Sequence, residues 1–382
     1  MDSSQDPLDI LVCGDFVPTG RACDLLERGA YSDLFGELAP IVKGTRLAIA
    51  NLEVPLVAGG SPIAKTGPHI NGNEKSAAAL AATGFNLVTL ANNHIRDFGD
   101  DGVLSTLATC RIHGLECVGA GSTLEEARNI YVHEFGGKKV AIVNAAENEW
   151  GTTSGLTPGA NPINPVSLYH SVRDALRLAD FVLVILHGGH ENYNLPSPRM
   201  KQLYRFLIDI GADAVIGHHT HCFSGFETYQ GKPIVYSLGN CVYDRGEGQG
   251  GVSPWHIGCA AHFSLRSSGS DFKLIPFIQW QPNVPGIALL RDQKLYDFQL
   301  QSDRLTAIIQ DDAALERRFD EFVRSRERSY RSYIEPTANR WLLAAMNRGL
   351  LPRFIRSRQK LYLMNLVRCE SHRDILLKVL EK

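Results

Sequence analysis

Apolar runs of strand length recur along the first 220 residues, and each of them ends in polar residues. Five such runs can be recognised, at residues 9–13, 47–50, 87–91, 181–186 and 214–216. A short apolar run bounded by polar residues is typical of a buried strand. In open α/β sheets, ligand sites lie outside the carboxyl ends of the strands. We therefore expect the polar residues that follow these runs to surround one crevice.

Segments with a helical pattern separate these strands. They cover residues 31–43, 73–83, 102–113, 167–179 and 198–210, and three of them are followed by Gly84, Gly114 or Gly211. A glycine just past a helix is a common C-terminal signal. Further apolar strands follow at 233–238, 258–265 and 272–279 without long helices, and we expect them to form a second layer against the first. The predicted fold is α/β, with two packed mixed β-sheets flanked by helices.

The composition changes at about residue 303, where charged, helix-forming residues become frequent and glycines rare. We expect one domain over residues 1–300 and a helical C-terminal extension over 301–382, with Pro336 and Pro352 separating its helices. The glycine-rich segment 244–251 predicts a surface loop over the site.

Composition excludes some classes of protein. The 39 Lys and Arg residues nearly balance the 41 Asp and Glu residues, so charge gives no sign of nucleic-acid binding. Eight cysteines without a CxxC pair indicate free thiols in a reducing compartment, and the polar start MDSSQDPLD lacks the pattern of a signal peptide. No stretch reaches the ~18 apolar residues of a membrane span. We expect a cytoplasmic protein.

The segment GHHTH, ending in His219, Thr220 and His221, predicts a metal site. Neutral imidazole is a common metal ligand, and histidines two apart on an extended segment face the same side. His218 would then face away from the metal and either pack in the core or orient a ligand. Carboxylate, amide and imidazole without thiolate suit one or two divalent ions of Mn, Zn or Fe, and also Mg. Such ions lower the pKa of bound water to about 7, which indicates hydrolysis.

Six ordered motifs carry a family resemblance. They are GD at Asp15, NLE at 51–53, NNH at 92–94, HGGHE at 187–191, GHHTH at 217–221 and YSLGN at 236–240. With them the chain resembles, over residues 8 to 280, the CapA-type family of poly-gamma-glutamate capsule synthesis, which itself resembles the calcineurin-like metallophosphoesterases. The resemblance implies a four-layer sandwich of two sheets and flanking helices, with a two-metal centre at the strand ends.

The resemblance also implies roles for single residues. Asp15, Glu53 and His221 would hold one ion, while Asn93, His187 and His219 would hold the other. His94 would protonate the leaving group. The first phosphoesterase motif, DxH, is here Asp15 followed by Phe16 and Val17, and the GD of the second motif is replaced by NLE. Spacing leaves open whether Asn51 or Glu53 bridges the ions, and charge favours Glu53.

Other candidate residues have equally plain alternatives. Arg21, Lys65 and His190 are candidates for contacts with an anionic substrate, although a loop cation or histidine is often only solvated. Glu191 could accept the second proton of His187 or be a plain surface carboxylate. Residues 349–369 contain no acidic residue, so this segment could bind an anionic membrane surface. Docking on its own domain, or on a second subunit in a homodimer, explains the same residues, and we favour docking.

These observations favour a metal-dependent hydrolase that cleaves a phosphoester or an amide in the synthesis of an anionic cell-surface polymer. A non-enzymatic accessory component of a polymer synthase is the first alternative. A phosphodiesterase unrelated to capsule is the second. Exchange of His94 would separate catalysis from an accessory role.

Overall fold

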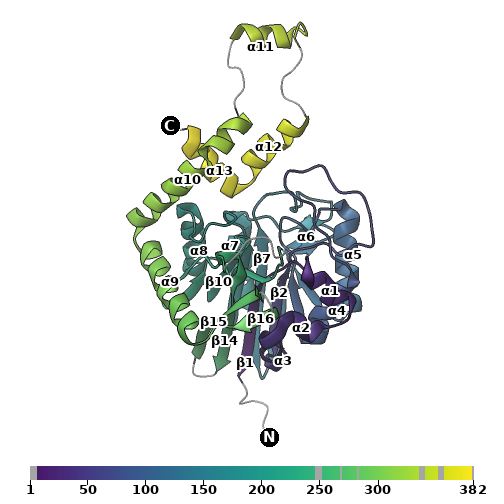
Figure 1. Ribbon diagram of the computed structural model, residues 1–382, viewed down its shortest axis with the longest axis vertical. Coiled ribbons are helices and arrows are strands. Elements are labelled where there is room, and N and C mark those ends of the chain that lie inside the picture. Colours follow the sequence, from purple (N-terminus) through teal and green to yellow (C-terminus); the bar gives the residue numbers. More distant parts are fainter. Residues whose placement is uncertain are drawn as a thin grey trace.

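The computed structural model describes residues 7–245, 252–266, 269–281, 284–334, 340–351 and 357–380 (Figure 1). Two mixed sheets form its centre. The first has the order β16-β15-β14-β1-β2-β3-β4, with β13 also paired to β1, and the second has the order β11-β12-β10-β9-β7-β6. A further pair, β5 and β8, stands apart.

The strands of the first sheet are β1 (Leu8–Phe16), β2 (Leu47–Leu52), β3 (Leu87–Thr89), β4 (Glu116–Val118), β13 (Asn240–Val242), β14 (Ile257–Arg266), β15 (Gly269–Gln281) and β16 (Val284–Leu289). Those of the second are β6 (Tyr131–Phe135), β7 (Lys138–Ala146), β9 (Phe181–His187), β10 (Ala214–His218), β11 (Phe226–Tyr229) and β12 (Lys232–Val235). The short pair is β5 (Ala120–Gly121) and β8 (Gly159–Ala160).

The helices are α1 (Arg21–Glu27), α2 (Tyr31–Phe35), α3 (Ala39–Gly44), α4 (Glu74–Thr83), α5 (Gly99–Ile112), α6 (Leu124–Ala127), α7 (Pro165–Leu178), α8 (Pro198–Asp209), α9 (Asp292–Gln310), α10 (Asp312–Ile334), α11 (Arg340–Asn347), α12 (Ser357–Arg368) and α13 (Glu370–Leu380). Local signals begin several of them. The side chains of Asn73, Asn164 and Ser197 accept backbone N–H groups at the starts of α4, α7 and α8.

Alternation along β1 explains how the sheets and helices pack. Ile10 and Val12 belong to the core between the two sheets, whereas Leu11 and Cys13 belong to the core under α1 to α5. Successive side chains of a strand point to opposite faces, so one strand serves both cores. Helices α7 and α8 pack against β7, β9 and β10 of the second sheet. The predicted α/β fold of two mixed sheets flanked by helices is confirmed.

Two details of the prediction are wrong. The late strands do not form a layer of their own, because β14 pairs antiparallel with β1 and extends the first sheet, while β12 joins the second. The helix expected over residues 31–43 is broken at Gly36, which has φ 47°. A Cβ at Gly36 would lie 2.3 Å from the carbonyl oxygen of Ile287, so the approach of β16 requires glycine there.

The C-terminal helices lie over the carboxyl ends of the strands. In Figure 1, β1 starts near the N-terminus at the bottom, and α10, α12 and α13 lie above the sheets while α11 projects beyond them. Helix α12 packs on α13 and α10, so in this structure the described part of the segment at 357–368 docks on its own chain. Helix α9 runs through residues 300 and 301, and the division into a domain and an extension there stays a proposal.

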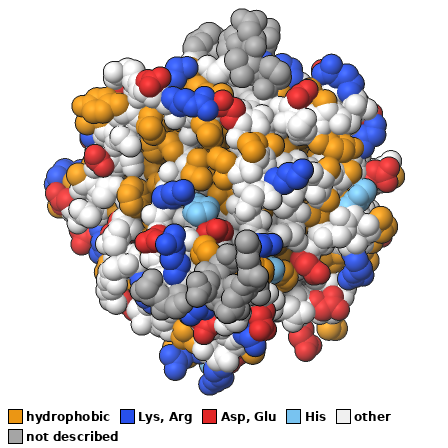
Figure 2. Space-filling view, turned by 90° about the horizontal axis from the view of Figure 1, so that it is seen from below, with side chains coloured by type: hydrophobic (Ala, Val, Ile, Leu, Met, Phe, Trp, Pro, Cys, Tyr) orange, Lys and Arg blue, Asp and Glu red, His pale blue; other side chains and the backbone are white. Residues whose placement is uncertain are grey.

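Several expectations fall outside the described residues. Pro336 and Pro352 do, as do all residues of the predicted glycine-rich loop beyond Arg245. In the described parts of the chain, none of the helices combines the length and apolar character needed to cross a membrane. On the face shown in Figure 2, opposite the C-terminal helices, described Lys and Arg side chains are interspersed with Asp and Glu.

Candidate metal centre

Strand ends of both sheets deliver the predicted ligands to one place. Asp15 lies near the end of β1, Glu53 directly after β2 and Asn93 after β3, all from the first sheet. His187 ends β9, and His219 follows β10 in the second sheet. All five side chains are buried. The convergence that the strand pattern predicts is present.

Two groups of three side chains share Glu53. Asp15, Glu53 and His221 form one group, and Glu53, His187 and His219 form the other, with the ligand atoms of each group within 4.8 Å of one another. Glu53 Oε1 lies 3.4 Å from His187 Nε2 and 3.9 Å from His221 Nε2. Glu53 therefore occupies the shared position.

Glu53 also provides the test of whether a cation fits. Its side chain is fully buried, and neither carboxylate oxygen has a hydrogen-bond donor among the described residues. Burial, together with the negative charge of Asp15, raises the pKa of Glu53 well above its ordinary value. A buried carboxylate without donors is costly unless a cation or a proton compensates it. Carboxylates and imidazoles around it suit a divalent cation.

Asn51 holds the two groups together. Its Nδ2 donates to Asp15 Oδ1 at 2.8 Å and lies 3.2 Å from His187 Nδ1, while its Oδ1 accepts from Thr89 at 3.3 Å. Asn51 thus orients one member of each group. The structure places Asn51, and not Glu191, at the second nitrogen of His187. Asn93 Oδ1 lies 3.0 Å from His187 Nε2, on the side of the second group.

The histidines after β10 converge through turns, so the expected extended segment is wrong. Strand β10 ends at His218, and His219 and His221 have φ values of 93° and 57°. Positive φ is uncommon for residues other than glycine and is found where function constrains the backbone. His218 Nδ1 lies 3.3 Å from Asp15 Oδ1, which places His218 beside a predicted ligand.

The pKa shifts of Asp15 and His187 favour metal binding. Burial alone would raise the pKa of Asp15, but hydrogen bonds and charges of His218 and His221 outweigh it and hold the pKa well below the ordinary value. Burial, with the charge of His219, lowers the pKa of His187 well below its usual range. An ionised carboxylate and a neutral imidazole are the forms that bind a cation.

His94 is oriented by a residue that the sequence analysis missed. Its Nδ1 lies 2.7 Å from Asp97 Oδ2, and Asp97 also accepts from the backbone of Ile70 and from Lys65 Nζ. Burial lowers the pKa of His94 although Asp97 opposes this. The position of Asp97, three residues after His94, is the sequence feature that could have identified it as the partner of His94. Lys65 was predicted to hold substrate, but here its charge is balanced by Asp97.

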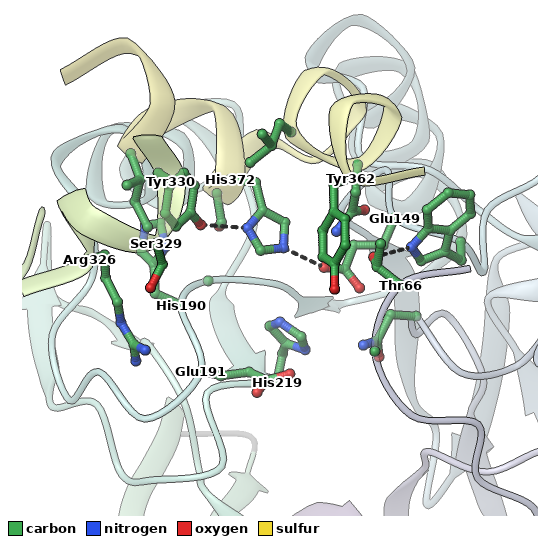
Figure 3. Close-up of a pocket in the computed structure, with 18 of the residues that line it drawn as sticks. Thr66, Glu149, His190, Glu191, His219, Arg326, Ser329, Tyr330, Tyr362 and His372 are labelled. Atoms are coloured by element: carbon green, nitrogen blue, oxygen red, sulfur yellow. Dashed lines mark hydrogen bonds and ion pairs between the residues drawn. The ribbon is translucent and has the colours of Figure 1, made fainter. Parts of the chain in front are cut away.

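A cavity of about 370 Å³ opens beside the second group (Figure 3). Asn93, His94 and His219 line it together with Lys65 and Glu191. Because Asp15 and His221 do not line the cavity, access to the centre from this side is through the Asn93 and His219 end.

Two other predicted contacts behave differently. His190 lines the cavity, but burial lowers its pKa to about 3, so it stays neutral, and its ring packs on Phe319 and Phe322. Arg21 is not among the lining residues. Its guanidinium donates to both carboxylate oxygens of Asp244, at 2.9 and 3.0 Å. This ion pair explains Arg21 without a substrate.

A third group, Glu149, Cys369 and His372, was also missed. His372 Nε2 lies 3.2 Å from Glu149 Oε1, and its Nδ1 lies 2.6 Å from the Tyr330 hydroxyl (Figure 3). Both ring nitrogens are thus engaged, and the group is explained as a contact that holds α13. More than 200 residues separate Glu149 from His372, so no local pattern could have paired them.

Curated relatives match more than half of this chain. The capsule biosynthesis protein CapA of Bacillus anthracis is 29% identical over 63% of this chain and 61% of its own length. The PGA biosynthesis protein CapA of Bacillus subtilis is 31% identical over 64% and 65%. A probable polyglutamine synthesis accessory protein of Mycobacterium tuberculosis is 31% identical over 57% and 61%. The matched region is thus less than two thirds of each relative.

A solved structure, that of a hypothetical protein from Thermus thermophilus, covers 72% of this chain and all of its own, at 17% identity and a TM-score of 0.45. This score is below 0.5, so the assignment depends on sequence. The profile of the family described as "Bacterial capsule synthesis protein PGA_cap" matches residues 9–245. Since that range is more than half of the chain, this protein belongs to the bacterial capsule synthesis family.

Proposed function

We propose that this protein is a metal-dependent hydrolase that acts in the biosynthesis of an anionic capsule or cell-surface polymer. The observation that supports this most strongly is Glu53, a buried carboxylate without a donor that two potential cation sites share. Membership of the capsule synthesis family supports the pathway. The names of two relatives mention PGA biosynthesis and polyglutamine synthesis, and the polymer proposed for this chain is poly-gamma-glutamate.

The centre would hold one or two divalent ions of Mn, Zn or Fe, with Mg also compatible. Asp15, Glu53 and His221 would hold one ion, and Glu53, Asn93, His187 and His219 the other. When bound, such ions supply Lewis-acid activation of water and of the scissile group. Asn51 would keep Asp15 and His187 in place, and Asp15 would remain ionised.

In its protonated form, His94 would donate the proton on Nε2 to the leaving group. Asp97 holds its Nδ1, which leaves Nε2 for the substrate, and the residue lines the cavity beside Asn93. An imidazole that a carboxylate orients in this way is a common general acid or base. The bond cleaved would be a phosphoester or an amide.

The test is turnover by purified protein loaded with Mn or Zn. Phosphomonoesters, phosphodiesters and gamma-glutamyl amides are the substrates to assay. His94→Ala should lower kcat by about 10² to 10⁴ while metal content stays unchanged. His170→Ala, on the exposed side of α7, is the matched control and should leave kcat unchanged. Absence of metal-dependent turnover on every substrate would count against the proposal.

An accessory role without catalysis is the second candidate, because the Mycobacterium tuberculosis relative is described as an accessory protein. The metal would then serve structure or the binding of a synthase. Polymer production in cells separates the two roles. Under the accessory role, His94→Ala should support production as well as the unmodified protein does. Under the hydrolase proposal it should not. A phosphodiesterase unrelated to capsule would be recognised from the substrate panel and normal polymer production without it.

A further inference from the structure

The C-terminal helices form one wall of the cavity beside the metal centre. Ten of the 23 lining residues lie on these helices: Phe322, Arg326, Ser329 and Tyr330 of α10, Tyr362, Asn365 and Leu366 of α12, and Ser371, His372 and Ile375 of α13. We call these ten residues the C-terminal wall. All of them lie outside the region matched by the capsule synthesis family.

We infer that the C-terminal wall binds the substrate, and that Arg326 holds an anionic group of it, a carboxylate or a phosphate. The inference rests on the proposed function, since it assigns the substrate-binding side of that site. In Figure 3, Arg326 and Tyr362 extend from the C-terminal helices toward the side on which His219 and Glu191 lie. Substrate at the metal centre would therefore touch both parts of the chain.

Ion pairs and hydrogen bonds hold the α13 part of the wall in a fixed position. Arg199 of α8 donates from Nε to Asp374 of α13 at 2.8 Å and from Nη2 to Glu147 at 2.5 Å. The backbone and side chain of Asn148 donate to the carboxylate of Glu370 at 2.8 and 2.7 Å. The loop after β7 thus fixes the start of α13, and a wall fixed in this way can orient a ligand.

Among the described residues that line this cavity, Arg326 is the cation whose charge is available. Lys65 is paired with Asp97, and His372 is paired with Glu149. Arg326 makes no ion pair or hydrogen bond with any residue that the structure describes, and its guanidinium lies 5.3 Å from the centre of the Phe322 ring. A guanidinium with free donors favours bidentate contact with a carboxylate or phosphate.

Size limits what the cavity can hold. A volume of about 370 Å³ is near the lower end of the roughly 300–1,000 Å³ of small-ligand pockets. This fits a short unit or the end of a chain, and not a long stretch of polymer. The rings of Trp150, Tyr330 and Tyr362 would cover its apolar part.

The experiment measures binding to the metal-loaded full chain by calorimetry. The probes are a gamma-linked glutamate tetramer, which carries carboxylates, and glycerol 3-phosphate. Arg326→Gln should raise the Kd of the better probe about tenfold or more, because a charge-assisted pair is lost. Arg324→Gln, also exposed on α10 but not in the wall, should change it by less than about twofold. The Kd of Arg326→Lys should lie between the Kd values of these two variants.

A second variant removes a negative charge from the cavity and should change the Kd in the opposite direction. Glu191 is an exposed carboxylate in the same cavity, so Glu191→Gln should tighten the binding of an anion. Equal Kd values for Arg326→Gln and Arg324→Gln, or no binding of either probe by the unmodified protein, would overturn the inference. Which of the two probes binds more tightly shows whether Arg326 prefers a carboxylate or a phosphate. Binding can be measured without turnover. Binding that depends on Arg326, in a protein that shows no hydrolysis, would contradict the proposed hydrolase function and support the binding role of the C-terminal wall.

Discussion

Asp15 and Glu53 are buried within 4.8 Å of the same histidine, but their surroundings differ. Asp15 accepts from Asn51 Nδ2 and from the backbone N–H of His219, and its pKa is held low. Glu53 has no donor among the described residues, and its pKa is raised by burial and by Asp15. The first carboxylate has partners in the protein that stabilise it without a metal ion, whereas the second does not. Glu53 is therefore the residue on which a metal acts most strongly.

Glu53→Gln should have opposite effects with and without metal. The amide keeps the shape but removes the buried charge, so the metal-free variant should gain about 1 kcal/mol in its free energy of unfolding. Its affinity for Mn or Zn should fall at least about 100-fold, since even residues that only support ligands contribute roughly 10- to 100-fold. Denaturant unfolding and metal titration measure the two effects.

Glu125→Gln, on the exposed side of α6, serves as the control and should change neither quantity. A variant at Glu53 that binds metal as the unmodified protein does would refute the shared-ligand assignment. A loss of stability in the metal-free variant would show that Glu53 has a structural partner instead.

At the scale of elements, the sequence predicts the strand ends well and the turns poorly. Each apolar run stops where the polar residue enters the site, so Asp15 and His187 could be placed from pattern alone. The bends at His219 and His221 could not, because positive φ at histidine has no sequence signal as strong as glycine. The pairing of His372 with Glu149 is set by docking of α13, which local pattern does not encode.

Docking of α13 depends on Arg199. Arg199→Met would leave the buried carboxylate of Glu147 without its cation, and breaking a buried pair costs about 3–5 kcal/mol. Arg199 is about a quarter exposed, so we expect a loss toward the lower end of that range. Hydrogen exchange should become faster across residues 370–380, and denaturant unfolding should show the loss.

The exposed pair of Arg177 and Asp174 on α7 gives a matched control. Arg177→Met should cost between about 0 and 1 kcal/mol and leave exchange in α13 unchanged. Equal effects of the two substitutions would mean that the ion pairs of Arg199 do not hold the helix.

At the scale of the whole molecule, the sequence predicts two sheets but not which strands belong to each. Residues 258–265 have the same apolar character whether they pair with β1 or lie in a separate layer. Antiparallel pairing of β14 with β1 depends on contacts about 250 residues apart, such as that between Ile10 and Phe263. Only the folded chain reveals that the first sheet combines the earliest and the latest strands, whereas the second sheet is built from strands between residues 131 and 235. The metal centre consequently lies at a junction of the two.

A cation at this junction should couple the stability of the two sheets. Asp15 and Glu53 belong to the first sheet, and His187 and His219 to the second, so bound metal joins them. Removing metal with EDTA should lower Tm by about 4 °C or more, because a ligand at a hundred times its Kd contributes about 2.7 kcal/mol. Hydrogen exchange should become faster at the carboxyl ends of both β1 and β9. The Glu53→Gln variant should not respond to EDTA, and faster exchange in one sheet alone would contradict the coupling.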